Sequence, residues 1–158
     1  MIFVCIGSRD YQFNRLLKAL DELVESGEVT EEIFAQIGQS QYVPEHYAWA
    51  RYLDADTFRQ YQKDADLIIS HAGTGALIGA LKLGKSVIAV PRYAKFGEHI
   101  DDHQHQIADV LSGAGYLYQV KDIADLGNTI ALAKAQPLNK KYDRPSYIGA
   151  LIKEFIGE

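Results

Sequence analysis

The sequence is poor in cysteine, in long apolar runs and in positive charge, and each shortage excludes a class of protein. Its one cysteine, Cys5, rules out a disulfide framework and argues against a thiolate zinc site. No stretch approaches the roughly 20 apolar residues that span a bilayer. The opening residues 1–7 lack the basic segment and the cleavage site of a secretory signal. We therefore expect a cytoplasmic protein without a membrane segment of its own.

The charge balance argues against nucleic acid as a partner. Lysine and arginine number 16 against 21 aspartate and glutamate, which gives a net charge of -5. Binding to a phosphate backbone needs a large basic surface, whereas a small nucleotide is bound by local backbone dipoles. The 158 residues, 47% of them hydrophobic, suit one globular domain with a substantial core.

Short apolar runs alternate with segments of helical periodicity along the whole chain. Runs rich in β-branched residues predict strands at 1–6, 32–38, 47–53, 66–70, 86–91 and 116–120. Helices are predicted at 12–27, 54–65, about 74–83, 101–115 and 122–136, with a closing helix at about 146–157 and a long loop at 39–47. This alternation predicts an α/β fold with a Rossmann-like, doubly wound parallel sheet, in a single domain over residues 1–158.

Three polar loops follow three of the predicted strands and should meet at one edge of the sheet. They are "GSRDYQF" at 7–13, "SHAGTG" at 70–75 and "PRYAKFGEHIDDHQ" at 91–104. In open α/β sheets, ligands bind outside the carboxyl ends of the strands, near the point where the strand order reverses. We expect the functional site at that edge.

The first loop has two interpretations. Ser8 and nearby backbone N–H groups could bind an anion at the start of a helix. Alternatively, the segment is a plain turn in which Ser8 or Asp10 caps the helix, and this simpler interpretation is favoured from these residues alone.

The "HAGTG" loop favours ligand binding. Gly73 and Gly75 allow close approach of a ligand, and Thr74 could cap the next helix while offering a hydroxyl to a phosphate. The motif is neither a P-loop nor the GxGxxG fingerprint of dinucleotide-binding proteins. The remaining candidate ligand is a diphosphate carried by a molecule other than an NAD-type cofactor. The alternative is a turn needed only for close helix–sheet packing. His71 could donate a hydrogen bond to a phosphate or a sugar, or to a backbone carbonyl. A role as a catalytic base is less favoured than either.

The densest polar cluster, at residues 98–105, also has several interpretations. A metal site is disfavoured, because His99 and His103 share a helix face only if the helix has already begun at His99. Recognition of a hydroxylated ligand at a helix start, by Asp102, His103 and Gln104, is the better hypothesis. A solvated, well-capped helix N-terminus, with Asp101 or Asp102 as the cap, is the simplest one.

Taken together, these motifs resemble the C-terminal domain of family 28 glycosyltransferases. The pattern "SHAGTG…LxLGKxxIxVPR…FGEHxDDHQ" and the opening "GSRDYQFNRL" carry the likeness, which runs from Met1 to about Ala114. The chain is most similar to small stand-alone members. These include the soluble subunit of the eukaryotic transferase that adds the second N-acetylglucosamine to a lipid-diphosphate precursor. Paired bacterial exopolysaccharide subunits are others.

The resemblance implies the C-terminal half of a GT-B enzyme, which binds the UDP-sugar while a membrane-associated partner binds a lipid-linked saccharide acceptor. It implies inverting transfer of a hexose or N-acetylhexosamine, without metal or other cofactor, at the inner face of the membrane. The residues implied for the diphosphate and sugar are Gly7, Ser8, His71, Gly73, Thr74 and Gly75, with Arg92, Glu98, Asp102, His103 and Gln104 near the sugar or the reacting atoms. His71 and Glu98 are the candidates for the catalytic base, which the partner could also supply.

One departure from the family pattern bears on function. Gly79 stands where the family usually carries an acidic residue that holds the ribose hydroxyls. A non-catalytic accessory subunit that enhances a partner glycosyltransferase is therefore the alternative function. A free-standing nucleotide-sugar binder or hydrolase is a third, because a fold alone does not fix function.

Overall fold

Parallel strands form one six-stranded sheet in the order β3-β2-β1-β4-β5-β6 within the described part of the chain. The computed structural model describes residues 1–7, 11–98, 103–138, 140 and 142, so the predicted closing helix at 146–157 lies outside it. The strands are β1 (Ile2–Cys5), β2 (Ile33–Gln36), β3 (Ala48–Ala50), β4 (Leu67–His71), β5 (Ser86–Val90) and β6 (Tyr118–Gln119). The predicted doubly wound parallel sheet is confirmed.

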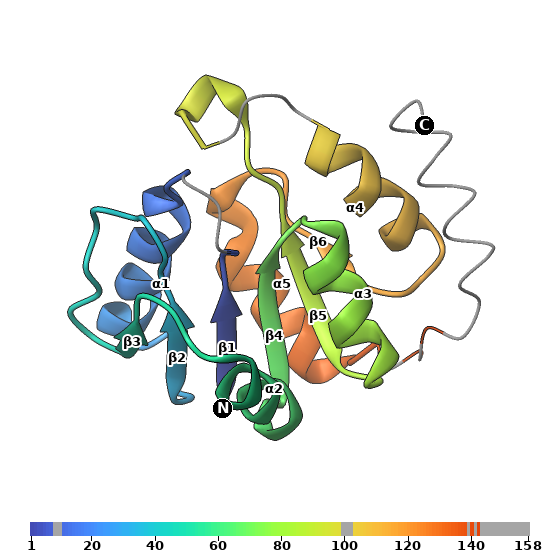
Figure 1. Ribbon diagram of the computed structural model, residues 1–158, viewed down its shortest axis with the longest axis horizontal. Coiled ribbons are helices and arrows are strands. Elements are labelled where there is room, and N and C mark those ends of the chain that lie inside the picture. Colours follow the sequence, from blue (N-terminus) through green and yellow to red (C-terminus); the bar gives the residue numbers. More distant parts are fainter. Residues whose placement is uncertain (8–10, 99–102, 139, 141, 143–158) are drawn as a thin grey trace.

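Helices cover both faces of this sheet. They are α1 (Asn14–Ser26), α2 (Ala55–Asp64), α3 (Thr74–Lys82), α4 (His103–Gly113) and α5 (Leu126–Ala135), with short 3-10 turns η1 (Ala94–Phe96) and η2 (Ile123–Asp125). In Figure 1, α1 and α5 lie behind the sheet, whereas α2, α3 and α4 lie in front of it. None of the helices described is long and apolar enough to cross a membrane.

The core is divided by the alternation of side chains along the strands. In β1, Ile2 and Val4 belong to the cluster formed with α1 and α5. Phe3 and Cys5, between and after them, belong to the cluster formed with α3 and α4, against which α2 also packs. Because side chains on a strand alternate between faces, a strand buried on both faces must be apolar throughout. This explains why the predicted strands are continuous apolar runs.

Several predicted helix ends are confirmed. Gly27 ends α1 in the left-handed conformation, with φ +83°. At the start of α2, the Asp54 carboxylate accepts a hydrogen bond from the Thr57 backbone N–H at 2.8 Å. Both arrangements are the ones that favour these residue types at these positions.

The predicted caps of α1 and α3 are wrong. The N-cap of α1 is Phe13, too far along the chain for Ser8 or Asp10 to cap the helix. Ser40 Oγ instead accepts from the Phe13 N–H at 2.9 Å, and Gln12 Oε1 accepts from the Asn14 N–H at 2.7 Å. The N-cap of α3 is Gly73, and Thr74 is already helical. Neither helix start therefore depends on a capping hydroxyl of its own loop.

The predicted loop at 39–47 is held by one buried carboxylate. Asp21, on α1, is 3% exposed and accepts from the Tyr42 hydroxyl at 2.7 Å. It also accepts from the backbone N–H groups of Glu45 at 2.8 Å and His46 at 2.9 Å. A carboxylate with several donors replaces the hydrogen bonds that a loop lacks.

Candidate functional site

A cleft of about 610 Å³ opens at the carboxyl ends of β1 and β4, between α2 and α3. Its lining residues, which define the β1–β4 cleft, are Cys5, Gly7, Gln36, Leu53, Ala55, Phe58, Arg59, Gln62, His71, Gly75, Ala76 and Gly79. The strand order reverses between β1 and β4, so the cleft occupies the position where open α/β sheets bind ligands. Of the predicted site residues, Gly7, His71 and Gly75 line it.

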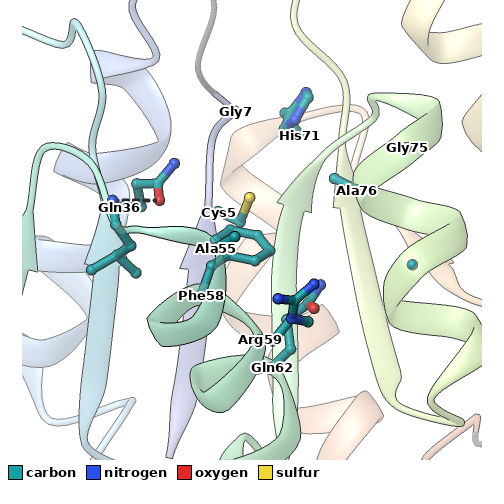
Figure 2. A pocket seen from close by; sticks show the side chains of 12 residues that line it. Cys5, Gly7, Gln36, Ala55, Phe58, Arg59, Gln62, His71, Gly75 and Ala76 are labelled. Carbon is teal, nitrogen blue, oxygen red and sulfur yellow. Dashed lines mark hydrogen bonds between the residues drawn. The ribbon is translucent and has the colours of Figure 1, made fainter.

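His71 closes the upper end of this cleft, at the last position of β4 (Figure 2). Its side chain packs against the backbone of two glycines. A Cβ at Gly7, where φ is +81°, would lie 2.8 Å from His71 Nε2, and a Cβ at Gly73 would overlap the imidazole ring. Both positions therefore require glycine because His71 occupies the space beside them.

The N-terminus of α3 opens onto the cleft beside His71. Gly73 is its N-cap, and no side chain makes the cap hydrogen bond. Gly75 lines the cleft, and a Cβ there would meet no atom within 4 Å. The first N–H groups of a helix have no partner inside the helix and carry a partial positive charge. This end of α3 can therefore bind an anion without a lysine or an arginine.

Besides Arg59, the deeper walls of the cleft combine apolar side chains with neutral polar groups. Gln36 Oε1 accepts from the Leu53 backbone N–H at 3.2 Å. Figure 2 shows that the amide nitrogen of Gln36 points away from this bond. The thiol of Cys5 is nearly inaccessible, and burial raises its pKa to about 11, so it stays protonated at neutral pH. Phe58 adds an aromatic surface on α2. Such a cleft suits an uncharged ring system that carries hydrogen-bonding groups.

Glu98 is buried outside the β1–β4 cleft and is held in an ion pair. Arg15 Nε lies 2.9 Å from Glu98 Oε2, and Arg15 Nη2 lies 3.0 Å from Oε1. The Tyr93 backbone N–H donates to the same Oε1 at 3.1 Å. Arg15 Nη2 also donates to the Pro91 carbonyl at 3.2 Å. The pair therefore ties the loop after β5 to α1.

Arg92 makes a second link between the same two regions. Its fully buried guanidinium donates to the backbone carbonyls of Ile6 and Tyr11. It also lies 5.3 Å from the centre of the Phe13 ring. The loop after β5 and the loop after β1 are thus joined beside the cleft, as predicted from the convergence of the three loops.

Some predicted residues fall outside the described part of the chain. They are Ser8 and Asp102, together with the side chains of Thr74, His103 and Gln104. Among the described residues, no group of three or more His, Cys, Asp or Glu side chains could hold a metal ion.

The sequence prediction missed the wall of the cleft that α2 provides. Leu53, Phe58, Arg59 and Gln62 all line it. The helix is polar along most of its length and carries one buried residue, Gln62, so its pattern indicates a solvated surface helix. The order of the strands could have indicated this wall. The helix before β4 must lie next to the point between β1 and β4 where the strand order reverses.

Comparison with known proteins identifies the family. The model of the glycosyltransferase family 28 C-terminal domain matches residues 1–148. The UDP-N-acetylglucosamine transferase subunit ALG13 of Saccharomyces cerevisiae is 41% identical over 54 residues, which is 34% of this chain and 25% of that protein. Its counterpart from Eremothecium gossypii is 33% identical over 75 residues, 47% of this chain and 35% of that protein. The matched segments thus span a quarter to about a third of those relatives.

Solved structures agree on the fold. The solution structure of ALG13 superposes with a TM-score of 0.66 at 19% identity, covering 98% of this chain and 96% of that one. The crystal structure of MurG from Acinetobacter baumannii gives a TM-score of 0.64 at 19% identity, covering 96% of this chain and 44% of that one. At this identity the likeness shows the fold alone.

Proposed function

Because the chain belongs to the glycosyltransferase family 28 C-terminal domain family, we propose that it is the donor-binding subunit of an inverting glycosyltransferase. The donor is a UDP-sugar, and the group transferred is a hexose or an N-acetylhexosamine. The acceptor is a saccharide linked to a lipid diphosphate, in the synthesis of a polysaccharide or lipid-linked oligosaccharide.

The observation that carries this proposal is the junction of the β1–β4 cleft with the N-terminus of α3. A diphosphate placed beside Gly75 meets the free N–H groups of the helix, and the rest of the nucleotide extends between α2 and α3. The volume of about 610 Å³ falls in the range of small-molecule sites. Apart from Arg59, whose guanidinium donates to Asp56, the described walls are uncharged and suit the nucleoside, whereas the charge of the ligand lies at the helix end.

The same geometry supplies the chemistry of an inverting transfer. The acceptor hydroxyl attacks the anomeric carbon from the face opposite the leaving diphosphate, and the bond from that carbon to the diphosphate oxygen breaks. The helix dipole stabilises the charge that develops on that oxygen. His71 lines the cleft and is the described candidate for bonding the phosphate or the sugar or for accepting the proton. Glu98 does not line the cleft, and we assign it a positioning role.

The acceptor half is proposed to come from a second, membrane-associated polypeptide. The relatives from Saccharomyces cerevisiae and Eremothecium gossypii are themselves named subunits. The fold of this chain matches 44% of the MurG chain, which fits a protein that supplies one half of such an enzyme. Catalysis then requires both chains, because the acceptor must be held over the donor.

One observation favours the alternative of a non-catalytic accessory subunit. The described residues that line the β1–β4 cleft include no carboxylate. They therefore lack the group that most often acts as the base toward a hydroxyl or a water in reactions at a sugar. In that case the chain would enhance a partner that carries the whole reaction. Binding of the donor distinguishes the two functions.

Calorimetric titration of the purified chain with UDP, UDP-N-acetylglucosamine, UDP-glucose and UDP-galactose tests the proposal. We expect saturable binding, with the tightest sugar naming the donor class. Gly75→Phe should abolish it by filling the cleft mouth, and Thr74→Ala should weaken it. The matched control is Gly113→Phe, because Gly113 on α4 is equally open but does not line the cleft. Absence of binding by a folded sample would support the accessory function instead.

A further inference from the structure

The Gln62 side chain lies in the cleft wall and presents its amide to the open space of the cleft. It lies on α2 and is 8% exposed, yet its side chain bonds to no other described residue. A primary amide offers two donors and an acceptor, and none of them is used within the described part of the protein. An uncommitted amide facing a cleft therefore indicates a group that pairs with a ligand.

The space in front of this amide is kept open by Gly79 on α3. A Cβ at Gly79 would lie 4.0 Å from Gln62 Nε2, and no other atom lies within that distance. Any larger side chain at this position would extend toward the amide and fill the cleft. Glycine inside a helix is unfavourable relative to alanine, so its presence here calls for a reason other than helix formation.

The spacing along α3 identifies the part of the ligand that reaches this point. Gly75 and Gly79 are four residues apart, which is about 6 Å along a helix. The cleft follows α3 from Gly75 to Gly79, so a nucleotide whose diphosphate lies at the N-terminus of α3 would place its ribose near Gly79. We propose that the Gln62 amide binds the ribose hydroxyls of the nucleotide, in the space that Gly79 leaves. This assignment rests on the proposed function as a nucleotide-sugar-binding subunit.

The neighbouring polar groups are less suited to this role. Arg59 also lines the cleft, but its guanidinium donates to Asp56 Oδ1 at 2.7 Å and its side chain is 62% exposed. Gln36 lies across the cleft on β2, with its oxygen bonded to the Leu53 N–H. Gln62 therefore presents both a donor and an acceptor to a pair of hydroxyls. A vicinal diol can use both at once, accepting from the amide nitrogen and donating to the amide oxygen.

The test compares ligands that differ only in the hydroxyls. Calorimetry with the full chain measures the affinities of UDP, 2′-deoxy-UDP and 3′-deoxy-UDP. Loss of a hydroxyl that pairs with a buried group should weaken binding roughly tenfold, so UDP should bind about tenfold more tightly than at least one deoxy analogue. Gln62→Leu, which keeps the volume but removes the polar atoms, should reduce that ratio to near one. Gln62→Met serves as the second variant if the leucine variant does not fold.

Two variants at Gly79 provide the matched control. Gly79→Ala places a methyl group in the space beside the amide, at ordinary contact distance, and should weaken UDP and both deoxy analogues by the same small factor. Gly79→Leu should weaken UDP and its deoxy analogues alike, because it fills the shared space.

The outcomes separate the two proposals. If the unmodified chain binds UDP and both deoxy analogues equally, or if the Gln62 variants keep the full ratio, the role of Gln62 is overturned while nucleotide binding stands. If no uridine nucleotide binds at all, the proposed function fails and this assignment fails with it. A ratio that is present in the unmodified chain and lost in the Gln62 variants confirms the assignment.

Discussion

Replacing Glu98 by glutamine tests whether this residue builds the site or carries out its chemistry. The substitution keeps the size of the side chain but removes its charge and turns one acceptor into a donor. In the folded protein the Glu98 oxygens accept two bonds from Arg15, at 2.9 and 3.0 Å, and one from the Tyr93 N–H at 3.1 Å. Glutamine can keep the bonds to Oε1, but its NH₂ group would face the Nε–H of Arg15.

The expected cost follows from the burial of this pair. The Glu98 side chain is 1% exposed and that of Arg15 is 16% exposed. Removing one partner of a buried ion pair costs about 3–5 kcal/mol, because the other charge stays buried and uncompensated. Retention of the Oε1 bonds places Glu98→Gln near the lower limit, at about 3 kcal/mol. For a chain of this size that corresponds to a fall in Tm of roughly 6–12 °C.

Two assays distinguish a positioning role from a catalytic one. Urea unfolding should show the loss of about 3 kcal/mol, and the double variant Arg15→Met with Glu98→Leu should recover much of it, since no charge is then left unpaired. Donor affinity of folded Glu98→Gln, measured well below its Tm, should change less than threefold, because Glu98 does not line the cleft. A variant as stable as the original chain that loses more than a hundredfold in turnover with a partner would refute this reasoning, because a catalytic base contributes that much.

Three further predictions test the walls and the loops. Burial raises the pKa of Cys5 from 9.0 to about 11, so the folded thiol keeps its proton where the unfolded one loses it. This thiol should lower the stability by about 1 kcal/mol per unit from pH 9 to pH 11, and Cys5→Ala should make the slope in urea titrations shallower by that amount. Gly73→Ala places a methyl group on the His71 ring and should cost about 1–3 kcal/mol in thermal unfolding, a loss that His71→Ala in the same chain should reverse. Asp21→Asn should cost about 2 kcal/mol. It should also return the pKa of Tyr42, which the hydrogen bond to Asp21 raises to about 12, toward 10 in an alkaline absorbance titration.

The fold was predictable because each of its elements has a local signal. Buried strands such as β4 and β5 are short, β-branched and bounded by polar turns, and crossover connections leave few arrangements for parallel strands. Helix ends were predictable where the residue supplies its own cap, as Asp54 does. They were not predictable at α1, because the hydroxyl that bonds its first turn comes from Ser40, 27 residues away.

The candidate site was only partly predictable from the sequence. Some of its residues belong to a recognisable local motif, whereas others depend on contacts with residues far away in the sequence. His71 and its glycines stand out in the sequence, and they do meet, although Gly7 and Gly73 are required by the imidazole itself. The use of Glu98 was not predictable, because its partner Arg15 lies 83 residues away and nothing local marks the pair. Gln62 looks like any polar residue of a surface helix until the packing of α2 beside α3 buries it.

The charged side chains that join the loops beside the cleft do not line it, whereas Arg59 lies in its wall. Arg15 and Arg92 hold the loops after β1 and β5 through Glu98 and backbone carbonyls. In the proposed function, the anion of the ligand is left to the N-terminus of α3, whose N–H groups are fixed by the helix before any ligand arrives. Such a site needs no side chain to reorganise when a diphosphate binds or departs. What it requires is a backbone without obstruction, which Gly75 and Gly79 provide along one side of α3.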